Sequence, residues 1–160
     1  MERVFFEMVK YYSGDPHQIQ HFTKVHDYAR MIGVGEKVDC NTMEILEIAA
    51  IMHDIGIKPA MEKYGIGNGK LQESEGPPVA RRMLENLEFS QEIIERVCYL
   101  IGHHHTYKNI DEIDYQILVE ADFLVNIHED KMNETSIKSV LEKVFRTNTG
   151  KEYCRAMFGV

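Results

Sequence analysis

Histidine is the residue type in this chain most able to form a chemically active site, because its eight copies are clustered. They stand at positions 17, 21 and 26, at 53, at 103 to 105 and at 128. His53 is followed directly by Asp54, and Asp122 lies inside a later apolar segment. Imidazole nitrogens and carboxylate oxygens together form the ligand set of zinc, manganese, iron and similar divalent ions. These residues would form a metal site if the fold brought them together.

The His53-Asp54 pair ends a segment, Ile45 to Met52, that is apolar on nearly every side except Glu47. Such a segment predicts a central helix that delivers both polar groups to a fixed interior position. A buried, unpaired carboxylate is costly, so Asp54 needs a cation or several hydrogen-bond donors. A metal ion would supply the cation. The alternative is an ordinary helix end, in which His53 bonds a carbonyl and Asp54 caps a neighbouring helix.

Two further polar groups are predicted to point inward. Asp122 has Leu118 at i−4 and Val125 at i+3, which places it at the border of an apolar helix face. His104 follows the apolar stripe of residues 97–101 at helical spacing. Alone, each could be a core salt bridge or a hydrogen-bonded histidine. Three inward groups of metal-ligand type on three helices favour a metal site instead.

A fourth ligand is expected from the segment that carries His17, His21 and His26. His21 and His26 are five residues apart, which separates them by about 140° at ~100° per residue of helix. They therefore flank the apolar stripe on opposite sides, and both cannot easily bind one ion. Periodicity does not choose between them.

The elements that must position these residues are helices, and the expected fold class is all-α with about six to eight helices. Few runs favour strands. A Ser-Gly-Asp-Pro turn at residues 13–16 separates the first two helices, and Asn41 followed by Glu44 predicts the start of the third. The expected helices are 2–12, about 17–33, 41–52, one from Pro77, one capped by Ser90, about 111–128, Thr135–Phe145 and Lys151–Met157.

Residues Tyr64 to Pro78 contain four glycines and are predicted to form the one long irregular stretch. Because the part from Tyr64 to Gly76 follows the His-Asp pair closely, we expect that part to be a mobile lid over the site.

Composition limits the possible functions. The chain has 160 residues, 44% hydrophobic and 28% charged, which predicts one globular domain over residues 1–160. A net charge of −8 opposes binding of long nucleic acid, and an anionic ligand would need a locally positive site. No segment is expected to span a membrane. Three separated cysteines, Cys40, Cys98 and Cys154, predict reduced, buried thiols in a cytoplasmic protein.

Taken in order, these residues resemble the HD-domain superfamily of metal-dependent phosphohydrolases, helical proteins named for an adjacent His-Asp pair. The segment His21-Phe22-Thr23-Lys24-Val25 is similar to the first motif of the family, Ala49 to Gly56 to the His-Asp motif, and Glu120-Ala121-Asp122 to the last one. The resemblance covers about residues 17–128. It favours His21 over His26, which stays an alternative.

The resemblance implies hydrolysis of a small phosphate ester, such as a nucleotide, at a divalent metal ion. The implied ligands are His21, His53, Asp54 and Asp122, with His104 as a further candidate, and Asp54 would also position the attacking water. The ligand set leaves the metal open among manganese, iron, cobalt, nickel, magnesium and zinc, and leaves open one ion or two.

This chain departs from relatives with two-metal sites, many of which have more histidines between the His-Asp pair and the last aspartate. Here that interval holds Gln72-Glu73-Ser74-Glu75-Gly76 and then the histidine triplet. Glu73 or Glu75 would complete a site or remain solvated. Within the triplet, His103 and His104 are better placed than His105, which is expected to lie beyond the helix end.

Basic residues near these motifs are candidates for phosphate contacts. They are Lys24, Lys58, Lys70 and Arg81 or Arg82. Each could equally be a surface charge. Two rival functions are a di-iron oxygenase, which some relatives are, and a metal- or nucleotide-binding module without turnover.

Overall fold

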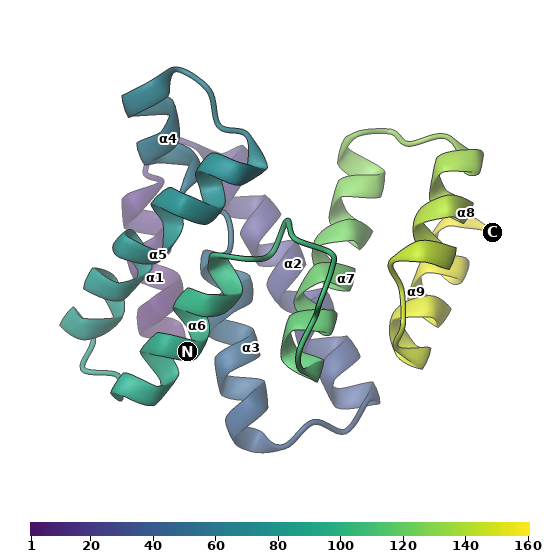
Figure 1. Cartoon of the computed structure of the whole chain (residues 1–160), viewed down its shortest axis with the longest axis horizontal. Helices are drawn as coiled ribbons and strands as arrows, with labels where there is room; N and C mark the ends of the chain where they lie inside the picture. Colours follow the sequence, from purple (N-terminus) through teal and green to yellow (C-terminus); the bar gives the residue numbers. More distant parts are fainter.

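A computed structural model describes all 160 residues and contains nine α-helices and no strand (Figure 1). The predicted all-α fold class is confirmed. The helices are α1 (Glu2–Tyr11), α2 (Pro16–Gly35), α3 (Cys40–Met52), α4 (Ile57–Tyr64), α5 (Gly69–Asn86), α6 (Gln91–Ile101), α7 (Ile113–Glu129), α8 (Glu134–Lys143) and α9 (Asn148–Phe158).

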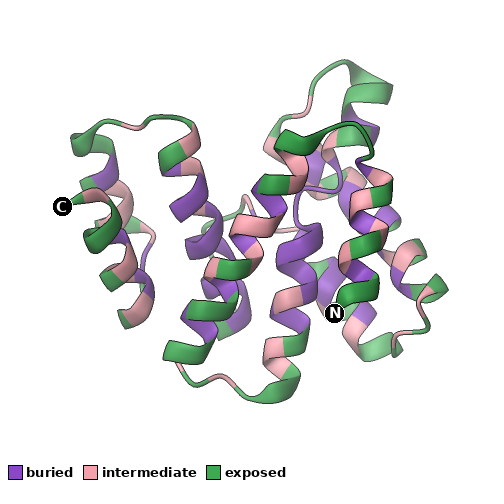
Figure 2. Cartoon of the chain, turned by 180° about the vertical axis from the view of Figure 1, so that it is seen from behind, coloured by how far each residue is buried: buried purple, intermediate pink, exposed green.

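Helix α3 is central: it packs against α1, α2, α6 and α7, while α2 also packs along α7. Helices α4 and α5 lie on one side of this centre, and α8 and α9 lie on the opposite side (Figure 1). Buried residues run along the central helices, whereas α8 and α9 bury few residues (Figure 2). Helix α9 packs against α7, α2 and α8. None of the helices combines the length and apolar character that crossing a bilayer requires.

Helix α3 begins earlier than predicted. Its N-cap is Asp39, whose carboxylate accepts the backbone N–H groups of Asn41 (3.0 Å) and Thr42 (3.1 Å). An aspartate at the N-cap satisfies donors that the helix leaves free. The early start puts Cys40 in the exposed first turn, so the prediction of three buried thiols is wrong for Cys40, while Cys98 and Cys154 are buried.

The prediction of a long irregular stretch over 64–78 is wrong. Only residues 65–68 lie between helices, because Asn68 caps α5 by accepting the backbone N–H of Leu71 at 3.1 Å. Pro77 and Pro78, predicted to start a helix, lie inside α5. Residues 69–76 are therefore held in a helix, and the remaining loop is too short for the predicted lid.

Gly56 explains how α5 reaches the end of α3. A Cβ at this position would lie 2.4 Å from the backbone oxygen of Gln72 and 2.7 Å from the backbone nitrogen of Gly76. Only glycine permits so close an approach of two backbones. The contact places the polar face of α5 beside the residues that follow His53-Asp54.

Candidate metal centre

Four side chains from three helices meet in the interior. His21 (α2), His53 and Asp54 (after α3) and Asp122 (α7) are all buried. The Nε2 atoms of the two histidines are 3.2 Å apart, and Asp122 Oδ1 lies 3.4 Å from each of them. Asp54 Oδ2 lies 3.7 Å from each of the same nitrogens. The ligand atoms of His21, His53 and Asp54 lie close enough together to hold one ion, and Asp122 approaches both histidines from α7.

A hydrogen bond at Nδ1 fixes the orientation of the imidazole rings of His21, His53 and His104. Carbonyl and carboxylate oxygens only accept hydrogen bonds, so an Nδ1 that contacts one must carry the hydrogen, and Nε2 of the neutral ring then has its lone pair free. This arrangement is typical of metal-binding histidines. The Nδ1 atoms of His21, His53 and His104 donate to Glu129 (2.9 Å), the Ala50 carbonyl (2.9 Å) and the Ile101 carbonyl (2.8 Å).

Asp122 gives the most direct sign that a cation belongs here. Its Oδ1 is buried and has no hydrogen-bond partner. Burial of a carboxylate oxygen without a donor or cation costs free energy. A divalent ion among Asp122, His21 and His53 would satisfy that oxygen, so the residues present fit a metal.

The charges of the cluster point the same way. Burial acts to lower the pKa of His21, but the neighbouring carboxylates of Asp122, Asp54 and Glu129 outweigh it and raise the pKa to about 9. Burial acts to raise the pKa of Asp54, but His53 and His104 lower it to about 2. The same competition leaves the pKa of Asp122 below its usual value. The carboxylates thus stay ionised and favour positive charge between them.

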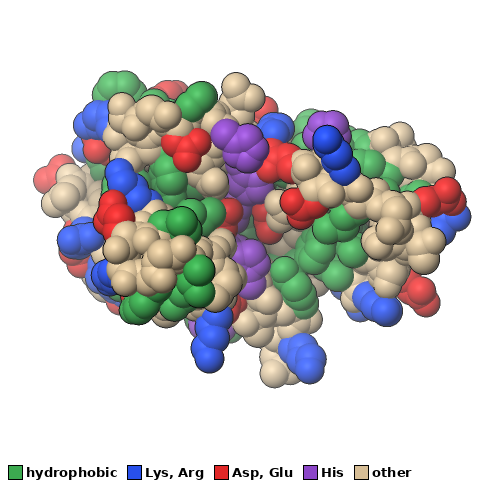
Figure 3. All heavy atoms as spheres, turned by 90° about the horizontal axis from the view of Figure 1, so that it is seen from above, with side chains coloured by type: hydrophobic (Ala, Val, Ile, Leu, Met, Phe, Trp, Pro, Cys, Tyr) green, Lys and Arg blue, Asp and Glu red, His purple; other side chains and the backbone are tan.

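A second set of ligand atoms shares Asp54. Its Oδ1 lies 3.1 Å from His104 Nε2 and 3.8 Å from His105 Nε2. Histidine side chains are visible in the hollow between the two halves of the molecule in Figure 3. The three atoms lie close enough together to hold an ion, so Asp54 stands between two candidate positions.

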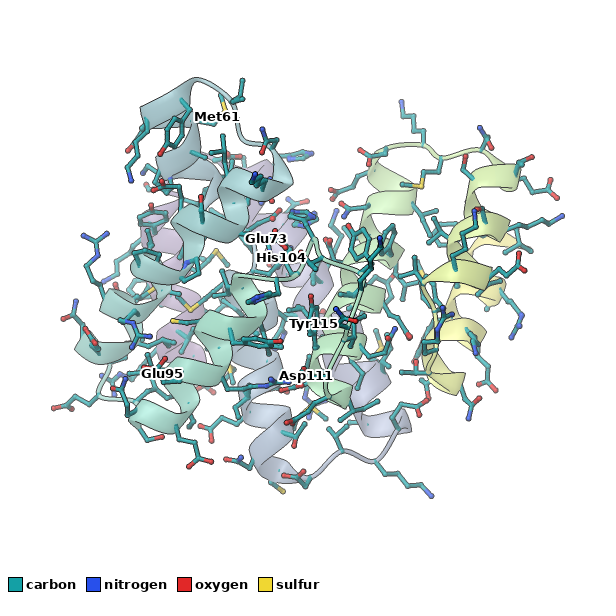
Figure 4. The ribbon with its side chains drawn as sticks, viewed as in Figure 1. Met61, Glu73, Glu95, His104, Asp111 and Tyr115 are labelled. Atoms are coloured by element: carbon teal, nitrogen blue, oxygen red, sulfur yellow. The ribbon has the colours of Figure 1, made fainter.

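The loop that carries His104 and His105 is anchored at both ends. The Tyr115 hydroxyl donates to the carbonyls of His103 and Thr106. Glu73 of α5 accepts the His105 backbone N–H (3.0 Å) and the Thr106 hydroxyl (2.9 Å). Figure 4 shows Glu73 near His104, where α5 approaches α6 and α7. Glu73, one of the acids predicted to complete a site, thus holds the loop.

The ring of His105 is held by Gln72. The Gln72 side-chain N–H donates to the Gly67 carbonyl at 2.7 Å, which turns its amide oxygen toward His105 Nε2. Because an amide oxygen only accepts, His105 Nε2 carries the hydrogen in this arrangement. An ion can bind that nitrogen only if the hydrogen moves to Nδ1 and the contact with Gln72 is broken.

The structure separates the alternatives that periodicity left open. His26 lies outside the cluster, with its Nδ1 at 3.3 Å from Asp27 and its Nε2 at 4.0 Å from Glu47. His103 also lies outside, because its ring stacks on Tyr99 with the ring centroids 4.3 Å apart, and its Nδ1 donates to the Tyr99 carbonyl at 2.7 Å. His105, expected to be less well placed than His103, lies closer to the cluster.

The predicted phosphate contacts are not gathered at the cluster. Lys24 pairs with Glu129, which in turn binds His21, so this lysine is one residue removed from the candidate ligands. The other basic candidates lie elsewhere. Lys58 donates to the Tyr11 carbonyl (3.0 Å), Arg81 forms a bidentate ion pair with Glu95 (2.9 Å), and Lys70 and Arg82 are exposed. The acid Glu75 pairs with Lys63 and does not complete the site.

Sequence reasoning missed Glu129 and Gln72. Glu129 stands seven residues after Asp122, two helical turns along the same face, and this spacing could have indicated it. Gln72 had no such signal, because its position depends on the contact between α5 and Gly56.

A solved structure shares this fold. The chain is similar to a protein described as a predicted HD superfamily hydrolase from an uncultured Thermotogales bacterium, with a TM-score of 0.71 and 21% sequence identity. The alignment covers 99% of this chain and 85% of that one. No curated protein sequence matches.

The family follows from the sequence itself. The model of the HD domain matches residues 19–144, most of the chain. The chain therefore belongs to the HD-domain family, and the resemblance read from its motifs is confirmed.

Proposed function

We propose that this protein is a metal-dependent phosphohydrolase that acts on a small phosphate ester. One observation carries the proposal: the buried Asp122 Oδ1 has no hydrogen-bond partner and faces two imidazole nitrogens. In an HD-domain protein, this arrangement supports a resident divalent ion.

His21, His53, Asp54 and Asp122 would hold that ion. Bound there, it would supply Lewis acidity that polarises a phosphoryl oxygen and activates water. Glu129 and the carbonyl of Ala50 keep the two histidines in the orientation that binding requires. Asp122 contributes its charge from inside the core.

Asp54 is the proposed catalytic residue, because it reaches both sets of ligand atoms. Its Oδ2 faces His21 and His53, and its Oδ1 faces His104. Its backbone carbonyl accepts the Tyr12 hydroxyl at 3.1 Å, which fixes the turn after α3. We assign Asp54 the task of orienting the attacking water and accepting its hydrogen bond.

A second ion would take Asp54, His104 and His105 as its ligands. Its ligand atoms are present, but Gln72 holds His105 with Nε2 as the donor. We therefore expect the site of His21 and Asp122 to fill first. The ligand types do not select among manganese, iron, cobalt, nickel, magnesium and zinc.

The substrate is expected to be small, such as a nucleotide or another phosphomonoester. The net charge of −8 opposes capture of long nucleic acid. The basic candidates Lys24, Lys58, Lys70 and Arg81 remain proposals for phosphate contacts, and Lys24 is the one tied to a candidate ligand through Glu129.

The test is phosphate release from a panel of phosphomonoesters and phosphodiesters, with each metal and with a chelator. His104→Ala and His103→Ala form a matched pair, since only His104 faces Asp54. We expect metal-dependent release that falls at least tenfold in His104→Ala, roughly the cost of losing one charged hydrogen bond, and stays near wild type in His103→Ala. Two bound irons with oxygen consumption and no release would establish the oxygenase instead, and bound metal without either activity would establish a binding module.

A further inference from the structure

A pocket lies away from the candidate metal centre, between the start of α2 and the end of α7, and α8 and α9 contribute to it. Its volume is about 470 Å³, within the range of small-molecule sites. Its floor is apolar and its rim is basic. The floor consists of Ile127, Met132, Ile137 and Phe158, and the rim carries His17, Gln20, Lys24, His128 and Lys131, with Glu129 in the wall.

Three of the rim donors are free, whereas Lys24 pairs with Glu129. His17, His128 and Lys131 are exposed, and their side chains make no hydrogen bond or ion pair within the protein. Figure 3 shows a histidine and a basic side chain next to each other on the right-hand part of the molecule. Lys131 therefore supplies a free positive charge in a chain of net charge −8, and the two imidazoles that line the same pocket supply further hydrogen-bond donors for an anionic ligand.

The apolar floor of the pocket indicates that its ligand has an apolar part. Ile127 and Ile137 are buried, and Met132 and Phe158 are partly buried against the core. A bare inorganic anion would leave these side chains without a partner. A molecule that fits both parts has an apolar body and an anionic group at one end.

Glu129 separates this pocket from the candidate ion position. It contacts His21 at Nδ1, whereas Nε2, on the other edge of the ring, faces His53 and Asp122. A ligand in the pocket therefore lies behind His21 and does not need the metal.

We propose that this pocket binds a small organic anion, whose apolar body contacts Ile127, Met132, Ile137 and Phe158 and whose anionic group is held by Lys131 and the rim histidines. This site is additional to the proposed hydrolase centre. Its test measures binding alone, so its failure would leave the proposed function intact.

The probe is naphthalene-2-sulfonate, because a sulfonate carries the charge but is a poor metal ligand. The full chain, saturated with Zn²⁺ and labelled at methionine and isoleucine methyl groups, is titrated with the probe and followed by NMR. We expect saturable shifts at Met132, Ile127 and Ile137. The neutral 2-naphthalenemethanol should bind about tenfold more weakly, since it lacks the charged hydrogen bonds.

Lys131→Gly is the decisive variant. Lys131 has a positive φ of 52°, in the turn after α7, and glycine favours that conformation. The variant therefore removes the side chain without disturbing the fold. Lys37, with a φ of 59° in the turn beyond the other end of α2, provides the control Lys37→Gly.

We expect about a tenfold loss of sulfonate affinity in Lys131→Gly and none in Lys37→Gly, with unchanged thermal unfolding in circular dichroism. The proposal is overturned by equal binding of the neutral compound, by equal affinities of the two variants, or by shifts confined to methyl groups outside the pocket. Absence of saturable shifts in the wild type overturns it as well.

Discussion

The candidate ligands are defined as much by the atoms behind them as by those that face the ion. His21, His53 and His104 each donate an Nδ1 hydrogen to a fixed oxygen, and this fixes the position of Nε2. For His53 and His104 the acceptor is a backbone carbonyl in the last turn of the preceding helix. For His21 it is Glu129, a charged side chain from α7, so this ligand is the one that substitution can test most cleanly.

Glu129→Gln should weaken metal binding by about tenfold, because the loss of its charge makes His21 a poorer ligand. The matched control is Glu47→Gln, which makes the same change of charge beside His26 on the outer side of α2. Isothermal titration with Mn²⁺ or Zn²⁺ measures both affinities. Equal affinities in the two variants would mean that Glu129 does not support the ligand.

Metal binding should release protons. In the metal-free protein the pKa of His21 is raised to about 9, because Asp122 and Asp54 outweigh the effect of burial. Below that pH the ring is protonated, so an ion must displace a proton. Metal affinity should therefore fall as the pH is lowered from about 9.

Titration at pH 7 in two buffers of different ionisation enthalpy counts the protons released. We expect at least one proton per ion. A binding enthalpy that does not depend on the buffer would contradict the protonated state assigned to His21.

At the scale of elements, the site depends on how close α5 comes to the end of α3. The approach rests on Gly56, whose missing side chain lets the backbones of α4 and α5 meet. Gln72 and Glu73 reach His105 only because of it. The first half of α5, which the sequence pattern predicted to be a loop, thus forms one wall of the candidate centre.

Gly56→Ala should destabilise the protein by about 1–3 kcal/mol, the usual cost of forcing an extra methyl group into a packed interior. The new Cβ would lie 2.4 Å from a backbone oxygen, which cannot rotate away. In the control Gly67→Ala, the nearest atom lies at 3.5 Å, an ordinary contact. Urea denaturation gives both free energies of unfolding, and a Gly56→Ala variant as stable as Gly67→Ala would show that the close contact is unimportant.

Helical periodicity predicted the elements that carry the candidate ligands, because α2, α3, α6 and α7 each bury a recognisable apolar face. It misread residues 69–76 because glycines and prolines were taken as loop signals. Asn68 and the contact with Gly56 hold that segment in a helix instead. The choice of His21 over His26 could not come from periodicity, since it depends on α7 packing against one side of α2.

In the whole molecule, the fold brings two negative charges together in the interior, and a cation is needed to balance them. Two buried carboxylates, Asp54 and Asp122, lie 68 residues apart in sequence and meet at the same two histidines. Membership of the HD-domain family and the shared fold of a solved relative place this convergence in a known architecture. The extent of residues 1–160 as a single domain stays a prediction.

Elemental analysis of His21→Ala beside His26→Ala tests the central claim most directly, because the two histidines share one helix and only His21 faces the buried carboxylates. Both purified variants are loaded with Mn²⁺ or Zn²⁺, desalted and analysed, with circular dichroism to check that each stays helical. We predict that His21→Ala loses most of its bound metal and that His26→Ala keeps the wild-type content. Retention of metal in His21→Ala with loss in His26→Ala, or equal content in both, would contradict it.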